Sequence, residues 1–400
     1  MKRMGLTHPP SRSAPTFDAY RAFDEGLGYY VRSMYWEARP HMHRAFALDS
    51  TFILPLLFAA SSHISVSQRA QADSVLGIVQ SYGDQLSNYH RLWLEILQAK
   101  VEGDWERQYR AGRRGAELAS GSMLVFEHAR VALRGLSRPQ EALDALATLD
   151  PERGPMRGWI SYWAVKTEAL HDLGDYQGEL EAAQQARRLY PDRHRAFLFE
   201  GMALAALGRG EEAIALVDEA LAMPSQHLSM DVPAEFMISL GLEARVHGQP
   251  EVAQGVFERV IEWYWARLPE GTCGGEGDNL GWALYHNGQF ADAKTCWESI
   301  LPAEPLLQEA VRLGIRGGLG LVAAKQGDLP EARRVLQWLR DSDLPYLRGH
   351  HLGAAAAIAE VLGDRRQAEA LLRQAFSEGF PHDRIWLNWY GLESLGLYEP

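Results

Sequence analysis

Long apolar runs and cysteines are scarce in this chain of 400 residues. No stretch of about eighteen apolar residues occurs, so the sequence predicts no membrane-spanning helix. The first fifteen residues, MKRMGLTHPPSRSAP, are partly basic but lack the apolar run of a secretory signal. Two cysteines, Cys273 and Cys296, are too few for a disulfide framework, which favours a reducing compartment. The sequence therefore predicts a cytoplasmic protein.

Positive charge is also in short supply, with 40 Lys and Arg residues against 52 Asp and Glu residues. The resulting net charge of −12 disfavours nucleic acid and anionic lipid as partners, because both are bound through clustered basic residues. Two basic stretches, 107–114 and 187–195, are more typical of solvated helix faces. The prediction is that the chain binds neither nucleic acid nor a membrane.

Motifs for catalysis, metals and cofactors are missing as well. The glycine-rich stretch 270–279 contains no lysine and follows a predicted helix, whereas phosphate-binding loops follow a strand. The histidine pairs His41 and His43, and His350 and His351, point to different faces of a helix, so neither pair makes a metal site. The chain is therefore expected to be non-enzymatic, without a metal or cofactor, and an enzyme is a remote alternative.

What the chain does contain is a recurring glycine. It stands at positions 174, 208, 248, 288, 327 and 363, at intervals of 34 to 40 residues, and each time it ends an apolar, helix-like run. Glycine at such a point supplies the left-handed conformation that lets the chain reverse after a helix. Spacing of this length predicts an array of helical hairpins.

Prolines support the same hairpin frame. Pro139, Pro250 and Pro330 each fall just after a predicted turn, at the first residues of a second helix, where a missing N–H is harmless. The clearest hairpin is 163–192, whereas the region 54–80 keeps only one alanine as a mark of register. Counting the weaker units, the sequence predicts about ten antiparallel hairpins.

The pattern resembles the tetratricopeptide repeat family over residues 17–380. The matching residues include Leu280-Gly281, Leu319-Gly320, Ala213, Ala220, Phe257, Trp297, Pro191 and Pro305. Thr167 and Glu179 depart from the family pattern, and several units exceed its usual length. The resemblance implies an all-α, right-handed superhelical solenoid, with an irregular tail at 1–16 and a C-terminal capping segment at 381–400.

A narrower resemblance is to the repeat-containing sensor halves of bacterial serine/threonine kinases and transcriptional activators. It is carried by the phrases AFALDSTF, LDPERGPMRGW, LPYLRGHH and AEALLRQAFSEGFPHD. In those proteins an effector domain precedes the repeats, and no kinase or winged-helix motif appears upstream here. The resemblance implies a stand-alone sensor or adaptor whose output domain is lost or supplied by another chain.

The family resemblance also implies where a partner binds. In that family the first helix of each hairpin faces a concave groove, and residues three and four apart along it form a stripe that suits an extended peptide. Most of the twelve tryptophans are expected in the core, with Trp93 and Trp282 as exceptions that face the groove. The predicted groove residues are Trp93, Lys100, Glu127, Arg134, Glu168, His171, Arg195, Glu235, Arg245, Asp278, Trp282 and Tyr285.

These expectations make the chain an interaction scaffold or sensor that binds a peptide or protein in its groove. One alternative is a structural protein whose solenoids stack end to end into a filament or oligomer. The apolar C-terminal segment RIWLNWYGLESLGLYEP is compatible with both, as a cap over the last hairpin or as a docking peptide for a neighbouring subunit. The partner itself is not encoded in any of these patterns.

Overall fold

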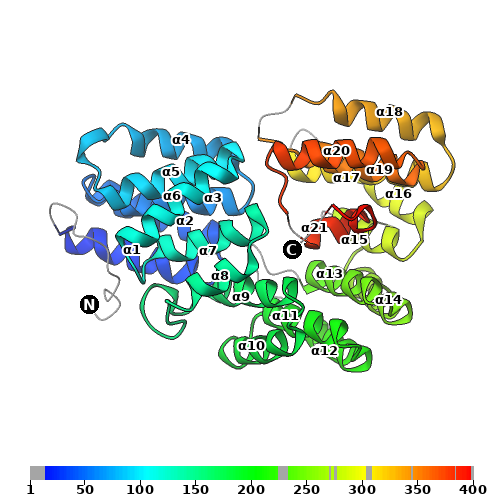
Figure 1. The fold of residues 1–400 in the computed structure, drawn as a ribbon, viewed down its shortest axis with the longest axis horizontal. Helices are drawn as coiled ribbons and strands as arrows, with labels where there is room; N and C mark the ends of the chain where they lie inside the picture. The colour runs from blue at the N-terminus through cyan, green and yellow to red at the C-terminus, as the bar shows by residue number, and fades with distance from the viewer. Residues whose placement is uncertain are drawn as a thin grey trace. The chain divides into compact units, whose positions relative to one another are not determined.

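The structure, a computed structural model, describes residues 14–223, 233–269, 272–273, 277–302, 309–343, 346–382 and 384–397. Within these ranges the chain forms 21 α-helices and three short 3-10 helices, and no strand (Figure 1). The predicted all-α class is therefore confirmed. The chain divides into two compact units, which we call unit 1 (up to Asp175) and unit 2 (from Tyr176) and describe one at a time.

Unit 1 contains nine helices in the part that the structure describes. Their bounds are α1 (Phe17–Tyr30), α2 (Tyr35–Leu48), α3 (Leu54–Ser65), α4 (Arg69–Gln80), α5 (Asn88–Glu102), α6 (Trp105–Leu118), α7 (Met123–Leu136), α8 (Pro139–Leu146) and α9 (Ile160–Asp172), with η1 (Gly83–Gln85) and η2 (Gly154–Met156) between them. Helices adjacent in sequence pack in pairs, α1 on α2, α3 on α4, α5 on α6 and α7 on α8. The region of weak register, 54–80, is thus an ordinary hairpin.

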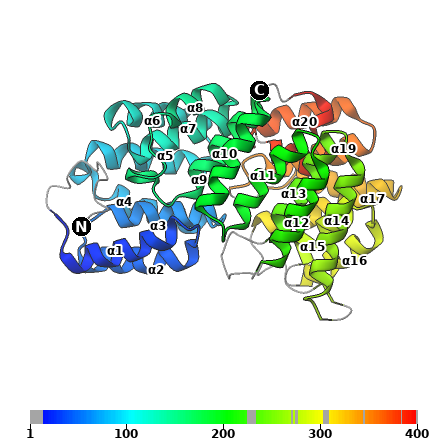
Figure 2. The same ribbon diagram turned by 90° about the horizontal axis from the view of Figure 1, so that it is seen from below.

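Unit 2 contains the remaining helices. Their bounds are α10 (Tyr176–Leu189), α11 (His194–Ala206), α12 (Gly210–Ala222), α13 (Pro233–Val246), α14 (Pro250–Trp265), α15 (Gly277–His286), α16 (Phe290–Ile300), α17 (Glu309–Lys325), α18 (Leu329–Arg340), α19 (His350–Val361), α20 (Arg365–Ser377), α21 (Arg384–Tyr390) and η4 (Glu393–Leu395). The pairs α11–α12 and α13–α14 run side by side in Figure 2. Four of the predicted pairs thus lie within unit 1 and five, α11–α12, α13–α14, α15–α16, α17–α18 and α19–α20, lie within unit 2, and the unit boundary falls between α9 and α10.

The six recurring glycines all adopt the left-handed conformation that the hairpin frame requires. Their φ angles lie between +73° and +82°. At Gly208 the turn is closed by two hydrogen bonds, from its own N–H to the carbonyl of Ala205 (3.0 Å) and from the N–H of Arg209 to that of Leu204 (2.8 Å). Serine occupies the equivalent turns after α1, α3 and α7, where Ser33, Ser67 and Ser137 have φ +59°, +58° and +50°, so three turns form without glycine.

Small residues let the two helices of a hairpin approach closely. A Cβ on Gly281 would lie only 2.3 Å from Nε1 of Trp297, so α15 contacts α16 at this point through backbone. Ala213 and Ala220 on α12 are completely buried, as predicted. The prolines Pro139, Pro250 and Pro330 stand in the first turns of α8, α14 and α18, which confirms the hairpin frame.

The interpretation of the cysteines was wrong. Cys273 and Cys296 form a disulfide with their Cα atoms 5.3 Å apart, and it ties the stretch before α15 to α16. Two cysteines 23 residues apart looked too few for a framework, but the hairpin fold brings this pair together. The cysteine count therefore no longer supports a reducing compartment. Among the helices described, each is too short or too polar to span a bilayer.

Candidate functional site

The predicted groove residues all lie on the first helices of their hairpins. These helices also pack on one another from hairpin to hairpin, α7 on α9 in unit 1, and α11 on α13, α13 on α15, α15 on α17 and α17 on α19 in unit 2. We call the side of these helices that is turned away from their own second helices the first-helix face.

A buried charge cluster occupies the first-helix face of unit 1. Nζ of Lys100 on α5 lies 2.7 Å from Oε2 of Glu127 on α7, and the same oxygen lies 3.2 Å from Nε of Arg130. Lys100 and Glu127 are only 8% and 4% exposed. Burial and the nearby Arg130 lower the pKa of Lys100 to about 7. Burial alone would raise the pKa of Glu127, but Lys100 and Arg130 bring it below its usual value.

A second ion pair continues along the same face. The guanidinium of Arg134 on α7 donates two hydrogen bonds to Oε2 of Glu168 on α9, from Nη2 at 2.7 Å and from Nε at 2.9 Å. A paired guanidinium and carboxylate satisfy most of each other's hydrogen-bonding capacity. Four of the predicted groove charges in unit 1 therefore join successive hairpins.

The two tryptophans predicted as exposed groove residues are instead core residues. Trp93 is fully buried and packs edge-on against Phe58, with ring centroids 4.9 Å apart. Trp282 is 3% exposed and lies 5.1 Å from Trp297, centroid to centroid. Both helices are covered by neighbouring side chains at these points, which the stripe spacing alone does not reveal. His171 is buried too.

On α15 the other predicted residues surround Trp282. The Tyr285 ring meets it edge to face at 5.8 Å, and Oδ1 of Asp278 is buried without a hydrogen-bond partner among the described atoms. Burial, followed by repulsion from Glu235, raises the pKa of Asp278 to about 7. The Asp278 carboxyl group thus changes its protonation state near neutral pH.

The remaining predicted residues lie on α11 and α13. The guanidinium of Arg245 donates to the carbonyl of His286 at 2.5 Å and lies over the ring of Phe257, 5.0 Å from its centroid. Arg195 is half-buried over the ring of Phe236, whereas Glu235 is exposed. Arg195, Glu235 and Arg245 therefore offer more accessible surface than the tryptophans do.

Residues 384–397, which we call the C-terminal segment, lie against the first-helix face of unit 2. Helix α21 packs on α13 and α19, and η4 packs on α20. Nδ2 of Asn388 donates to Oε2 of Glu243 at 3.3 Å, and Arg384 lies 3.6 Å from the other oxygen of that carboxylate. The segment thus contacts the last hairpin, as a cap does, and reaches back to α13 as well.

Sequence reasoning missed Glu243, the residue on which the polar contacts of the C-terminal segment converge. Its side chain is completely buried, and besides the segment it contacts His247, with Nε2 at 2.7 Å from Oε1. The available signal was a lone acidic residue within the apolar stretch FMISLGLEA of α13. A charge in such a setting needs partners, and besides His247 one of them, Asn388, is supplied from 145 residues away.

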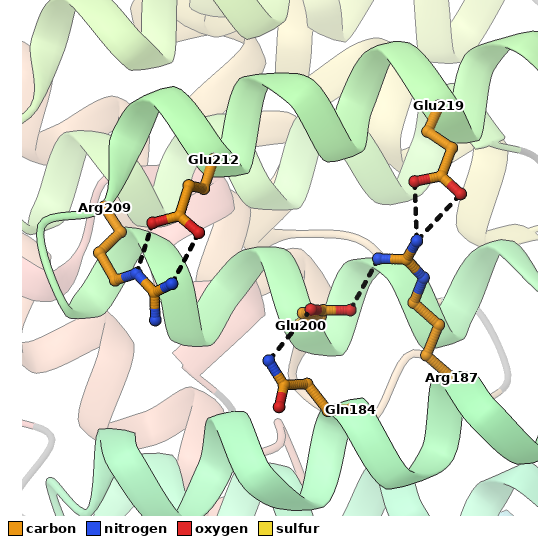
Figure 3. Close-up of polar contacts among 6 residues, drawn as sticks. All are labelled: Gln184, Arg187, Glu200, Arg209, Glu212 and Glu219. Atoms are coloured by element: carbon orange, nitrogen blue, oxygen red, sulfur yellow. Dashed lines mark hydrogen bonds and ion pairs between the residues drawn. The ribbon is translucent and has the colours of Figure 1, made fainter.

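A small pocket of about 340 Å³ lies away from this face, between α10, α11 and α12. Its lining consists of Gln184, Arg187, Arg188, Pro191, Phe197, Glu200 and Glu219. Figure 3 shows that the Arg187 guanidinium bridges Glu200 at 2.9 Å and Glu219 at 2.7 Å. Because two carboxylates already surround this cation, the pocket is a junction between helices and not an anion site.

Two stretches of the sequence, residues 168–227 and 279–343, match the tetratricopeptide repeat family. A search of curated proteins gives no significant match. The first stretch is the part of the chain with the most regular hairpin spacing, and it contains α11 and α12. The second stretch contains most of α15 and all of α16 to α18.

Solved structures to which the chain shows similarity include three with low sequence identity. Yeast Tom70 is 11% identical, with 95% of this chain and 96% of that chain covered and a TM-score of 0.45. A Rap protein complexed with competence and sporulation factor is 13% identical, with 82% and 97% covered and a TM-score of 0.34. The Cut9–Hcn1 hetero-tetramer of APC/C is 11% identical, with 96% and 92% covered and a TM-score of 0.31. Identities this low carry no information about a partner or an activity.

Proposed function

Because the chain carries tetratricopeptide repeats, we propose that it is a non-enzymatic interaction scaffold that binds a peptide or protein on its first-helix faces. We expect the partner to be a polypeptide, since the accessible predicted residues Arg195, Glu235 and Arg245 carry both signs of charge. Arg195, Glu235 and Arg245 are the residues that we expect to contact it. A sensor or adaptor role and a cytoplasmic location, both predicted from the sequence, belong to this proposal.

One observation carries the proposal more than any other. In unit 2 the first-helix face already holds a short stretch of polypeptide, the C-terminal segment, through edge-on aromatic contacts, a hydrogen bond and an ion pair to a buried carboxylate. A surface that binds one peptide in this way has the chemistry to bind another, because rigid repeats present it with little rearrangement. Unit 1 offers the corresponding helices with their charges paired internally.

Site-specific cross-linking tests which surface binds the partner. A photoreactive amino acid is placed at Glu235, exposed on α13, and in a matched variant at Glu251, exposed on the second helix α14. After irradiation in an extract of the native host, we expect a discrete protein adduct from position 235 and none from position 251. Equal adducts from both positions, or none from either, would contradict the proposal.

A further inference from the structure

The C-terminal segment is bound as a ligand would be bound. Its apolar side chains Leu387, Leu392 and Leu395 are buried, and Asn388 is buried with them. The aromatic rings divide between two helices, with Trp389 5.5 Å from Trp282 on α15 and Trp386 5.3 Å from His350 on α19. The segment therefore covers the first helices of several hairpins and not only the end of the array.

Its own secondary structure is too short to persist without this contact. Helix α21 has seven residues, and Gly391 ends it in a left-handed conformation with φ +69°. A helix of two turns is unstable in water because nucleation is unfavourable and too few hydrogen bonds follow. The segment is accordingly folded by the surface to which it is docked.

The polar contacts of the segment show which chemical groups a ligand of this face has to present. The Glu243 carboxylate receives the amide of Asn388 and the guanidinium of Arg384, one on each oxygen. A fully buried carboxylate is costly unless donors or cations accompany it, so any replacement for the segment has to supply such groups. Arg365 of α20 adds hydrogen bonds to the carbonyls of Ser394 (3.0 Å) and Leu395 (3.4 Å), which require only a backbone.

The connection to the repeats is short. Residues 378–383 join α20 to α21, and within them Phe380 is fully buried against Gly353 of α19. The segment can therefore leave the surface only from about residue 381 onward, and its local concentration near the surface stays high. A short flexible tether gives an effective concentration in the millimolar range.

We propose that the C-terminal segment is a tethered internal ligand of the first-helix face of unit 2, and that a partner peptide displaces it by presenting the same chemistry. That chemistry is a short amphipathic helix with an aromatic pair beside an amide or guanidinium group that reaches Glu243. The inference rests on the proposed function in treating this face as a binding surface. It adds the class of partner and the element that regulates access.

The test uses the full chain and a fluorescent peptide of residues 384–397, RIWLNWYGLESLGL. In the variant Asn388→Asp a carboxylate replaces the amide beside Glu243, so the chain's own segment is repelled and the surface becomes accessible to added peptide. Fluorescence anisotropy should show weak binding to the parent and about a hundredfold tighter binding to the variant, given a millimolar tether against a peptide affinity of about 10 μM. Asn88→Asp adds the same charge at an exposed position of unit 1 and should leave binding as in the parent.

Two further measurements make the result decisive. A peptide that itself carries Asn388→Asp should not bind to any variant, and hydrogen exchange of the parent should show α21 opening at least about a hundredfold faster than α13. If α21 exchanges as slowly as α13, or if Asn388→Asp folds with a released segment but binds peptide no better than the parent, the proposal is overturned. The proposal would also be overturned if the parent chain were a dimer and the Asn388→Asp variant a monomer. The segment would then dock on a second copy of the chain.

The outcome is separable from that of the proposed function. Peptide exchange requires no outside partner, so it can fail while cross-linking at position 235 succeeds. Conversely, peptide exchange can succeed in a chain for which no partner adduct forms.

Discussion

The first-helix face of each unit contains a buried carboxylate, and the two units neutralise it in different ways. In unit 1 the buried carboxylate of Glu127 is neutralised by Lys100 from the preceding hairpin and by Arg130 from its own helix. In unit 2 the buried carboxylate of Glu243 receives Arg384 and Asn388, which belong to the end of the chain. Equivalent helices of one repeat array thus use buried charge for internal cohesion in one place and for docking in another.

This difference teaches how to distinguish a structural charge from a binding charge in a repeat protein. Glu127 is joined to elements that cannot leave without unfolding the unit. Glu243 is joined to His247 of its own helix and to a seven-residue helix that can leave by itself. Both carboxylates are buried, so the two cases differ only in whether the element that carries the cation can leave without unfolding the unit.

The largest expected effect comes from removing the carboxylate in unit 1. Glu127→Gln leaves Lys100 and Arg130 buried without their counter-charge, and breaking a buried pair in this way costs about 3–5 kcal/mol of unfolding free energy. Urea denaturation followed by circular dichroism measures the loss. A change below about 1 kcal/mol would mean that the cluster is hydrated and contributes little.

The matched change in unit 2 is Glu243→Gln, and it should destabilise the fold by no more than about 1–2 kcal/mol, the range for a buried hydrogen-bonding group. The cost is smaller because Arg384 can follow the C-terminal segment into solvent. Hydrogen exchange should instead show lost protection confined to residues 384–397. Equal destabilisation by Glu127→Gln and Glu243→Gln would remove the distinction between the two faces.

The next effect concerns the disulfide, which lies in unit 2. Replacing Cys273 and Cys296 by alanine, or reducing the parent, should lower the stability of this unit by about 2–4 kcal/mol, as expected for a loop closed over 23 residues. Thermal melts with and without reductant measure it, together with a thiol assay that finds no reactive thiol before reduction. The alanine variant serves as control, since reductant should not change its melting temperature; two reactive thiols in the unreduced parent would contradict the bridge.

An effect of opposite sign in the two units is expected from pH. Asp278 has a pKa raised to about 7, so the folded state binds its proton more tightly than the unfolded state, and stability should fall as pH rises from about 4 to 7. Lys100 has a pKa lowered to about 7, so the unfolded state binds its proton more tightly, and stability should rise between pH 7 and about 10.

Urea midpoints across pH for Asp278→Asn and Lys100→Met assign the two slopes. Asp278→Asn should remove the acid-side slope and leave the alkaline slope, and Lys100→Met should do the reverse. A parent whose midpoint is flat over both ranges would show that neither group is as strongly perturbed as its burial implies.

The hairpin array could be predicted from the sequence because its signals are local. A glycine with positive φ at the end of one helix and a proline at the start of the next are decided within a few residues, as at Gly248 and Pro250. The ten hairpins follow from counting these marks. The serine turn at Ser137 also falls at its expected place, whereas the serine turns at Ser33 and Ser67 were not predicted.

The candidate site could be predicted only in part because its contacts are not local. The stripe spacing placed Lys100 and Glu127 on the correct helices, but it did not indicate that they pair across a hairpin. It also placed Trp93 and Trp282 at the surface, because helical spacing does not report what packs on top of a side chain. Glu243 and its partner Asn388 are separated by 145 residues, so no local pattern joins them.

The disulfide has one more consequence, which concerns the covalent topology of the chain. Cys273 and Cys296 enclose the whole of α15, the helix that carries Asp278 and Trp282, within a closed ring. Cleavage by a protease inside this ring would leave both fragments joined, so the cut chain would migrate as one species until a reductant separates it. Helix α15, which Trp389 contacts edge-on, therefore lies in a segment whose two ends are covalently linked to each other.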